Sequence, residues 1–371
     1  MPAPHRPPPR GVWLHGTDPA LVPALHILAG QLAAQPESPP CFVTGDSAFP
    51  GPGDDLRSID AQLDHFATRL IVLAGAVLPV PLIERARARG VALMLVDAEN
   101  PVPSGGWRIL PGYARGVLGQ FQQIHARDAL TASAIARQVR GAVPVFDTGR
   151  LARHAPVPGC NILELDALRQ SLGARPTWLA HDLPGDEAAA VLAAHAQALR
   201  RAHRLLLIVQ PRDPAEGVVL ATQAAAAGFT TARRAADEEI SETAQVYIAD
   251  SGAESGLFLR LAPVTFLGGS LSQGAGTSSP VPVAALGSAL VFGPWVGGEE
   301  RGFVETLRGT GGGRQILGPG ELGGAVSALL SPEVGAEAAL KAWTLATDGS
   351  DATWTVTRGI CDWLRLNGAA A

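Results

Sequence analysis

A run of glycine and serine residues in the C-terminal half of the chain has the residue types that bind an anion. After an apolar segment at 264–267 come Gly268, Gly269, Ser270 and, further along the loop, Ser278 and Ser279. Pro280 then suits the first turn of a short helix, which either of the last two serines can cap. Free N–H groups at a helix start attract negative charge, and small residues let a phosphate approach. A ligand-free tight turn is the alternative, since neither GxGxxG nor GxxxxGK[ST] is present.

Three further polar residues follow predicted strands and are candidates for acid–base chemistry: His15, Asp18 and His181. Histidine titrates near neutral pH, and a carboxylate is a common general base. Each also has a structural interpretation, because Asp18 precedes a proline as an N-cap would and histidines at strand ends are often held by hydrogen bonds. No His, Cys, Asp or Glu residues have metal-ligand spacing, and the three cysteines lack a CxxC pattern. We therefore expect no metal, no cofactor and no disulfide framework.

The composition is that of a globular protein with two domains. The chain has 371 residues, of which 47% are hydrophobic and 17% charged. Its net charge of −5 gives no electrostatic case for nucleic-acid binding. No apolar run reaches the roughly 18 residues of a membrane span. Residues 1–11 have no apolar core, so we expect a disordered lead rather than a signal peptide.

Apolar runs alternate with helical patterns in the first half of the chain. The expected strands are 12–16, 41–45, 69–75, 91–98 and 142–147. The expected helices are 19–34, 56–67, 79–89, 111–123 and 126–139. This alternation predicts a doubly wound α/β domain over 12–150, the N-terminal domain.

Proline and glycine residues over 151–175 predict a hinge, followed by a second, C-terminal α/β domain over 176–350. Its expected strands are 177–181, 203–209, 246–250, 264–267, 289–292 and 315–317. Its expected helices are 185–201, 214–228, 254–261, 280–286, 320–330 and 333–346. A C-terminal helix is expected within 351–371, with Trp354, Ile360 and Leu364 on one face. Such a pair of domains predicts a cleft enzyme with ligands at the carboxyl ends of the strands.

Several short motifs, in order and at the right separations, resemble the 3-deoxy-D-manno-octulosonic acid (Kdo) transferases. Six segments of this chain correspond to motifs of that family. Near the glycine loop they are 268–271 for G-G-S-L, 280–285 for P-x-E-P-A-A and 293–294 for G-P. Before it they are 185–187 for G-E-E, 211–216 for P-R-H-P-E-R and 250–258 for D-T-M-G-E-L-G-L-F. Weaker matches lie at 85–96 and 110–112. The resemblance implies a GT-B fold, with two Rossmann-like α/β domains facing a cleft and a C-terminal helix. It makes 12–150 the acceptor-side domain and 176–350 the donor-side domain.

The resemblance implies donor-binding roles for Arg212, Glu254, Gly268, Gly269, Ser270, Ser278 and Ser279. An arginine after a strand can hold a phosphate with two parallel hydrogen bonds, although a solvated loop arginine is the alternative. Glu254 suits either the hydroxyls of a donor sugar or the first turn of a helix, where a carboxylate is favoured in any case. For Ser278 and Ser279 we favour the capping role.

The first domain departs from the family pattern where the family carries its chemistry. The family's catalytic Glu falls on Ala20 or Leu21, so Asp18 is the only nearby candidate base. Both acids of an E-x-E-x-W-P motif are absent from 75–80. Other family positions hold different residues, namely Glu99 for Arg, Ala152 for Lys, Ser278 for His, Ser279 for Asn and Pro282 for Glu.

The resemblance implies an inverting, metal-independent glycosyltransferase. It would move Kdo or a related sugar from a CMP-activated donor to a lipid A-type acceptor in lipopolysaccharide biosynthesis. The lost acids leave open a catalytically degenerate homologue that binds a nucleotide, a glycolipid or a partner transferase. A third reading is another GT-B enzyme, such as a nucleotide-sugar epimerase. The family usually carries an N-terminal membrane anchor that this sequence does not show, so we expect a cytoplasmic protein with at most peripheral contact to the inner membrane. The oligomeric state is not predicted.

Overall fold

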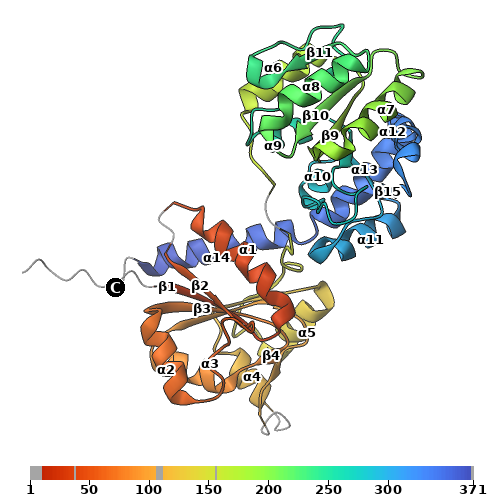
Figure 1. Ribbon diagram of the computed structural model, residues 1–371. Helices are drawn as coiled ribbons and strands as arrows, with labels where there is room; N and C mark the ends of the chain where they lie inside the picture. Colours follow the sequence, from red (N-terminus) through yellow and green to blue (C-terminus); the bar gives the residue numbers. More distant parts are fainter. Residues whose placement is uncertain (1–10, 37–38, 106–111, 155–156, 369–371) are drawn as a thin grey trace, which may run out of the picture. The chain divides into compact units, whose positions relative to one another are not determined.

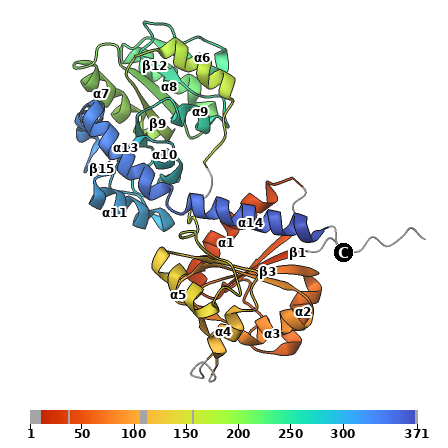
Figure 2. The same cartoon turned by 180° about the vertical axis from the view of Figure 1, so that it is seen from behind.

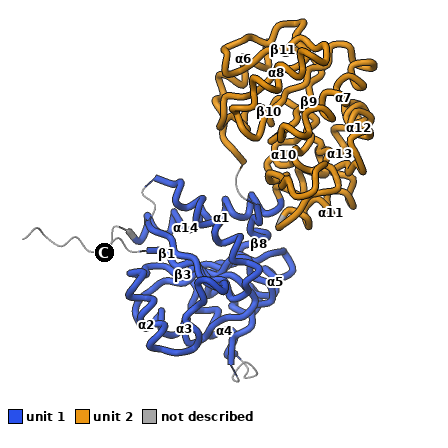
Figure 3. The backbone as a smooth tube through the Cα atoms, in the orientation of Figure 1, with its two compact units in different colours: residues 1–155, 348–371 blue, residues 156–347 orange. Residues whose placement is uncertain are grey.

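The computed structural model describes residues 11–36, 39–105, 112–154 and 157–368, and it divides into two compact units (Figure 3). Unit 1 comprises residues 1–155 and 348–371, and unit 2 comprises residues 156–347. Most of the expected lead and part of the motif at 110–112 lie outside the described residues, whereas Gly11 belongs to the first strand.

Unit 1 is built on a parallel sheet of six strands in the order β2-β1-β3-β5-β7-β8 (Figure 1). The strands are β1 (Gly11–Gly16), β2 (Cys41–Thr44), β3 (Thr68–Ala74), β5 (Ala92–Ala98), β7 (Gln123–Ala126) and β8 (Val145–Asp147). The short strands β4 (Val77–Leu78) and β6 (Val102–Pro103) form a separate parallel pair. The helices are α1 (Val22–Ala33), α2 (Leu56–His65), α3 (Val80–Ala88), α4 (Tyr113–Leu118), α5 (Ala129–Val139) and α14 (Ser350–Gly368). Strand order reverses between β1 and β3, which is the position where open α/β sheets bind ligands.

Each face of the unit 1 sheet packs against its own set of helices. Trp13, Ile71 and Leu95 point to the face covered by α2 to α5, where Ile83 and Ile135 are buried. The alternate strand residues, such as Leu14, Val72 and Met94, point to the face covered by α1 and α14. The near-continuous apolar strands therefore follow from burial on both sides.

Unit 2 has a second parallel sheet, with seven strands in the order β11-β12-β10-β9-β13-β14-β15. The strands are β9 (Thr177–Leu183), β10 (Leu206–Pro211), β11 (Thr231–Arg233), β12 (Val246–Ile248), β13 (Val264–Leu267), β14 (Ala289–Phe292) and β15 (Gly313–Gln315). The helices are α6 (Ile162–Leu172), α7 (Ala188–Leu199), α8 (Gly217–Ala226), α9 (Ser255–Leu259), α10 (Val281–Ala285), α11 (Arg301–Thr310), α12 (Leu322–Leu329) and α13 (Pro332–Ala346). Here the strand order reverses between β9 and β13.

One face of this sheet packs against α7, α8 and α12, around Trp178, Phe266 and Val291. The opposite face packs against α6, α9, α10 and α11, around Ile208 and Phe292. The expected α/β class, with two Rossmann-like domains and a C-terminal helix, is confirmed. None of the helices in the described part of the chain is both long and apolar enough to cross a membrane.

Several expected elements differ from the structure. The helix expected over 111–123 ends at Leu118, and β7 occupies Gln123–Ala126, because Ile124 and Ala126 are buried between neighbouring strands. Helix α6 lies inside the interval expected as a hinge, and α11 and β11 were not anticipated. On the final helix Trp354 is 54% exposed, and Val356 rather than Trp354 shares the buried face with Ile360. Trp354 precedes Val356 by two residues, which places it on a different side of the helix.

Candidate functional site

The glycine loop leaves β13 at the point where the strand order of unit 2 reverses. The Gly268 N–H donates to the His181 carbonyl at 2.8 Å, next to the end of β9. A Cβ atom on Gly268 would lie only 2.4 Å from the Asp182 carbonyl oxygen. Glycine at 268 is thus required by close backbone packing.

A buried carboxylate occupies the N–H groups of this loop. Glu187 is 3% exposed, and its Oε2 accepts a hydrogen bond from the Gly269 N–H at 2.8 Å. Its Oε1 accepts from the N–H groups of Leu271 at 2.8 Å and Ser272 at 3.0 Å. The loop does have the anion-binding geometry expected from its sequence, but the anion in it belongs to the same chain. Sequence reasoning missed this role; the only signal was the carboxylate in the G-E-E-like segment.

Arg212 follows β10, as expected, and it holds the loop from the other side. Its Nε and Nη2 donate to Asp182 Oδ2 at 3.2 and 3.0 Å. Its Nη1 donates to the Ala275 carbonyl at 2.7 Å and its Nη2 to the Gly276 carbonyl at 2.9 Å. The guanidinium therefore connects the end of β9 to the glycine loop. A Cβ atom on Gly269 would lie 2.0 Å from the Gly276 carbonyl oxygen, and the φ of this residue is +77°, so this position also needs glycine.

The three serines of the loop have different surroundings. Ser270 is fully buried, and its Oγ donates to the Leu267 carbonyl at 2.5 Å and accepts from the Gly293 N–H at 2.8 Å. Ser279 Oγ accepts from the Val281 N–H at 3.4 Å, a long version of the expected cap. Ser278 does not cap the helix, since its buried Oγ has no hydrogen-bond partner among the described residues. Pro280 takes the N-cap position, so α10 begins one residue later than expected.

Glu254 takes part in an ion-pair network beside α9. Its carboxylate accepts from Arg234 Nε at 3.1 Å and Nη2 at 2.8 Å, and from the Ser251 hydroxyl. Arg234 also pairs with Glu164. The hydrogen bonds from Arg234 lower the pKa of Glu254, so the carboxylate is ionised at neutral pH. This network lines a cavity of about 500 Å³ that also contains Tyr247.

His181 is buried at the end of β9 with a defined hydrogen-bonding arrangement. Its Nδ1 lies 2.7 Å from Gln210 Oε1, and Gln210 Nε2 donates to Ser255 Oγ at 2.9 Å. Since an amide oxygen only accepts, Nδ1 carries the hydrogen and Nε2 remains an acceptor. Burial lowers the pKa of His181 below its usual range. Burial thus favours the neutral imidazole, and the buried, hydrogen-bonded ring fits the structural interpretation of His181.

The corresponding reversal point in unit 1 lies between β1 and β3. Thr17 donates its N–H to the Ala74 carbonyl at 2.9 Å, and a Cβ atom on Gly75 would lie 2.2 Å from Thr17 Oγ1. Asp18 Oδ1 accepts from the Ala20 N–H at 2.9 Å, which makes Asp18 the N-cap of a short 3-10 turn. Of the two positions expected to match the catalytic Glu, Ala20 is exposed and Leu21 is buried.

His15, near the same point, is also neutral at physiological pH. It is 7% exposed, and its Nδ1 lies 2.9 Å from Thr44 Oγ1. Burial lowers its pKa to about 4. A Cβ atom on Gly51 would lie 2.3 Å from the His15 ring. His15 therefore also fits the structural interpretation, for the same physical reason as His181.

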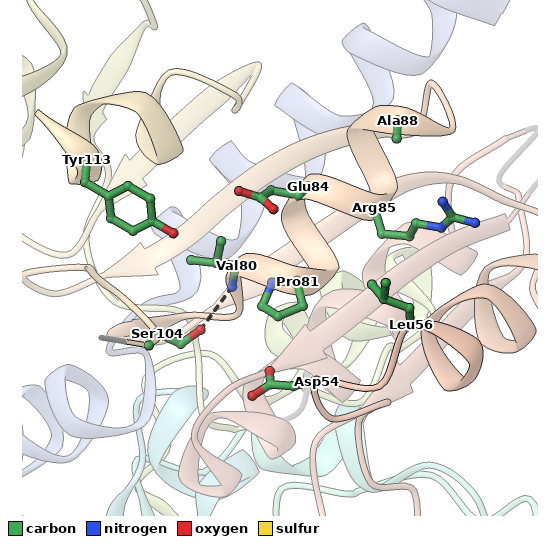
Figure 4. Close-up of a pocket in the computed structure, with 10 residues that line it drawn as sticks. Asp54, Leu56, Val80, Pro81, Glu84, Arg85, Ala88, Ser104 and Tyr113 are labelled. Carbon is green, nitrogen blue, oxygen red and sulfur yellow. Dashed lines mark hydrogen bonds between the residues drawn. The ribbon is translucent and has the colours of Figure 1, made fainter. Parts of the chain in front are cut away.

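A separate cavity of about 560 Å³ lies beside α3 in unit 1 (Figure 4). Val80 and Pro81 form part of its apolar wall, and Glu84 and the Tyr113 hydroxyl point into the same space (Figure 4). Arg85 is directed away from Glu84 and pairs with Asp60 through two hydrogen bonds of 2.7 and 2.6 Å. Neither Asp54 nor Glu84, the two carboxylates of the lining, forms an ion pair with a described residue. The cavity thus combines apolar walls with negative charge.

Within the described residues, no three His, Cys, Asp or Glu side chains gather as metal ligands. The arrangement in unit 2 is a loop fixed between a buried carboxylate and an arginine, with a neutral histidine as a hydrogen-bond acceptor beside it. Of the predicted donor-binding residues, the fold brings Arg212 close to Gly268–Ser270. Glu254 instead belongs to the separate ion-pair network with Arg234.

Sequence comparison identifies a curated relative. The chain is 24% identical over 298 residues to a 3-deoxy-D-manno-octulosonic acid transferase from Haemophilus influenzae, which covers 75% of this chain and 69% of that protein. No family model matches the sequence. The chain is therefore similar in sequence to a Kdo transferase over three quarters of its length.

Solved structures with similar folds were also found. The C-terminal CMP-Kdo binding domain of WaaA from Acinetobacter baumannii is 24% identical with a TM-score of 0.47, covering 50% of this chain and 96% of that domain. MurG from the same species is 15% identical with a TM-score of 0.43, covering 95% of this chain and all of that one. A UDP-N-acetylglucosamine 2-epimerase is 11% identical with a TM-score of 0.35, covering 97% of both chains.

Proposed function

We propose that this chain is a glycosyltransferase of the Kdo transferase type. It transfers Kdo or a related sugar from a CMP-activated donor, held by unit 2, to a lipid A-type acceptor on the side of unit 1. The observation that carries the proposal is the alignment with a Kdo transferase over 298 residues. The glycine loop at the strand-order reversal of unit 2 supports it, because open α/β sheets bind ligands at that position.

The mechanism needs a base for the acceptor hydroxyl and stabilisation of the departing phosphate. Asp18 is the carboxylate at the β1 end of unit 1 and is the proposed base. The neutral His181 offers a hydrogen-bond acceptor to the CMP-activated sugar. Ser278 Oγ, which has no partner among the described residues, is available for a hydrogen bond to the same sugar nucleotide. The loop itself is preorganised by Glu187 and Arg212, so binding does not have to order it.

The reaction takes place at the cytoplasmic face of the inner membrane, with the protein in peripheral contact. The cavity beside α3 carries two carboxylates without ion-pair partners among the described residues, which disfavours the phosphates of a lipid A precursor at that spot. If the acceptor binds in this cavity, we therefore expect a molecule related to lipid A that carries less negative charge.

The test is a transfer assay with CMP-Kdo and a lipid A precursor. Release of CMP that depends on the acceptor, together with a glycolipid heavier by one sugar in mass spectrometry, is the expected result. Incubation with UDP-N-acetylglucosamine alone, followed by chromatographic separation of its 2-epimer, tests the epimerase alternative, because epimerisation changes neither the mass of the sugar nor the acceptor. No product and no CMP release with any lipid acceptor would exclude the transferase.

A catalytically degenerate homologue is the second candidate function, and the absence of a carboxylate at Ala20 and Leu21 favours it. In that case calorimetry should detect binding of CMP or CMP-Kdo without turnover. Asp18→Asn separates the two candidates, since asparagine keeps the cap but cannot act as a base. Loss of transfer in this variant supports the enzyme.

A further inference from the structure

Three arginines at the carboxyl edge of the unit 2 sheet, of which Arg212 was expected to meet a phosphate, are already paired with carboxylates of the same chain. Arg212 is 3.0 Å from Asp182, Arg233 is 2.6 Å from Asp250, and Arg234 pairs with Glu254 and Glu164. Glu187 occupies three N–H groups of the glycine loop. An anionic ligand would have to displace one of these carboxylates at the expected positions.

A small cavity further along the same edge has a different charge balance. It measures about 210 Å³ and lies between α11 and the ends of β14 and β15. Figure 2 shows α11 beside β15. One face of α11 contributes Arg301, Glu305 and Arg308, at spacings that place them one above another. The segment after β14 contributes Gly293 and Pro294, and the end of β15 contributes Gln315.

The two arginines of this cavity lack close counter-charges among the described side chains. Arg308 Nη1 donates to Gln315 Oε1, a neutral partner, at 2.9 Å. Arg301 Nε lies 3.9 Å from Glu305 Oε1, which is longer than the roughly 2.8 Å of a charge-assisted hydrogen bond. The side chains of this pair are 70% and 61% exposed, so solvent screens their attraction. Two guanidinium groups thus face one weakly paired carboxylate.

We propose that this cavity binds a phosphate group. Its volume is below the roughly 300 Å³ at which pockets for whole small molecules begin, so it holds one oxyanion rather than a complete nucleotide sugar. Guanidinium groups bind phosphate oxygens through paired N–H donors, and Gln315 Nε2 adds a neutral donor. The proposal concerns a site outside the glycine loop and does not depend on the transfer reaction.

Isothermal titration calorimetry with inorganic phosphate at low ionic strength tests the site. We expect binding to the full-length protein that weakens at least tenfold in Arg308→Ala and in Arg301→Ala. Arg314→Ala is the matched control, because Arg314 is exposed on β15 and does not line the cavity. Arg308→Lys keeps the charge without the paired donors and should weaken binding by a smaller factor, which guards against a folding defect in the alanine variant.

The outcomes are separable from those of the transfer assay, because phosphate binding needs no turnover. A second titration with CMP identifies the source of the phosphate: a parallel loss in the arginine variants indicates a nucleotide phosphate, and an unchanged affinity indicates free phosphate. Absence of phosphate binding to the unaltered protein would overturn the proposal. Equal weakening in Arg314→Ala would do the same, since it would reveal general surface charge rather than a site.

Discussion

The two units share one architecture but differ in the number of charged groups at the point where strand order reverses. In unit 2 this point is rich in charge that is paired within the chain, with Glu187 on the loop N–H groups and Arg212 on Asp182. In unit 1 the same point carries a neutral buried histidine, an exposed alanine and a single capping carboxylate. The comparison teaches that a rigid framework of paired charges can be present at the reversal point of one unit, while the corresponding point of the other unit has a single carboxylate, Asp18, that caps a turn.

The largest effect should come from Glu187, the residue on which the charged framework depends. Glu187→Ala would leave three N–H groups without this partner, one of them buried and two partly buried, at a cost of roughly 3–5 kcal/mol in the free energy of unfolding. Denaturant unfolding measures this change. Asp186→Asn is the control, since Asp186 is exposed one residue away and should change stability by less than about 0.5 kcal/mol. A small effect of Glu187→Ala on stability would mean that the paired charges do not hold the loop of unit 2, and the two units would then not differ in this respect.

The next largest effect concerns the neutral state of His15 in unit 1. Its pKa is lowered to about 4 from 6.5, so the unfolded chain binds the proton more tightly. The contribution of His15 to the free energy of unfolding is therefore fully present above about pH 6.5. It is lost as the pH falls toward 4, by up to about 3 kcal/mol. His125 and His195, whose pKa values are also about 4 through burial, act in the same direction.

Unfolding measured between pH 4 and pH 7 checks this prediction. His15→Asn should reduce the dependence of stability on pH, whereas replacement of His26, exposed on α1, should leave it unchanged. An equal slope in all three proteins would mean that His15 is protonated in the folded state.

A moderate effect is expected for Arg212, which we interpret as a loop-positioning residue. Arg212→Ala removes its bonds to Asp182, Ala275 and Gly276 and should cost about 1–2 kcal/mol. Hydrogen exchange of the amides at 272–279 should become at least several-fold faster. Arg212→Lys, which cannot span the same partners, should give an intermediate rate. Unchanged exchange would indicate that the arginine is free to serve a ligand.

The smallest effect belongs to Asp18. Asp18→Ala removes the N-cap and should cost about 1 kcal/mol, whereas Asp18→Asn should be nearly neutral because asparagine caps equally well. Thermal unfolding of the two variants measures the difference. Similar destabilisation by both would show that the negative charge of Asp18, rather than its cap, stabilises unit 1.

The sequence predicted the framework better than the site. Strands β13 and β14 were predicted to the residue, since glycine and proline bound both of their apolar runs. Strand β7 was missed because only Ile124 and Ala126 are apolar among its four residues. Sequence pattern alone could not pair Glu187 with Gly269, because the two positions are 82 residues apart and meet only through the fold. For Arg212 the pattern gave the position at a strand end but not its partners.

Helix α14 has a consequence for the order in which the chain folds during synthesis. It comes from the last residues of the sequence, yet Val356 and Ile360 are buried against α1 and the first sheet. Thr353 Oγ1 also accepts from the Ala152 N–H at 2.7 Å. Unit 2 is a continuous segment and can close before α14 has been made, but one face of the unit 1 core stays partly uncovered until α14 has left the ribosome. The half that is made first is thus the half that is completed last, and a short C-terminal truncation should damage the N-terminal unit.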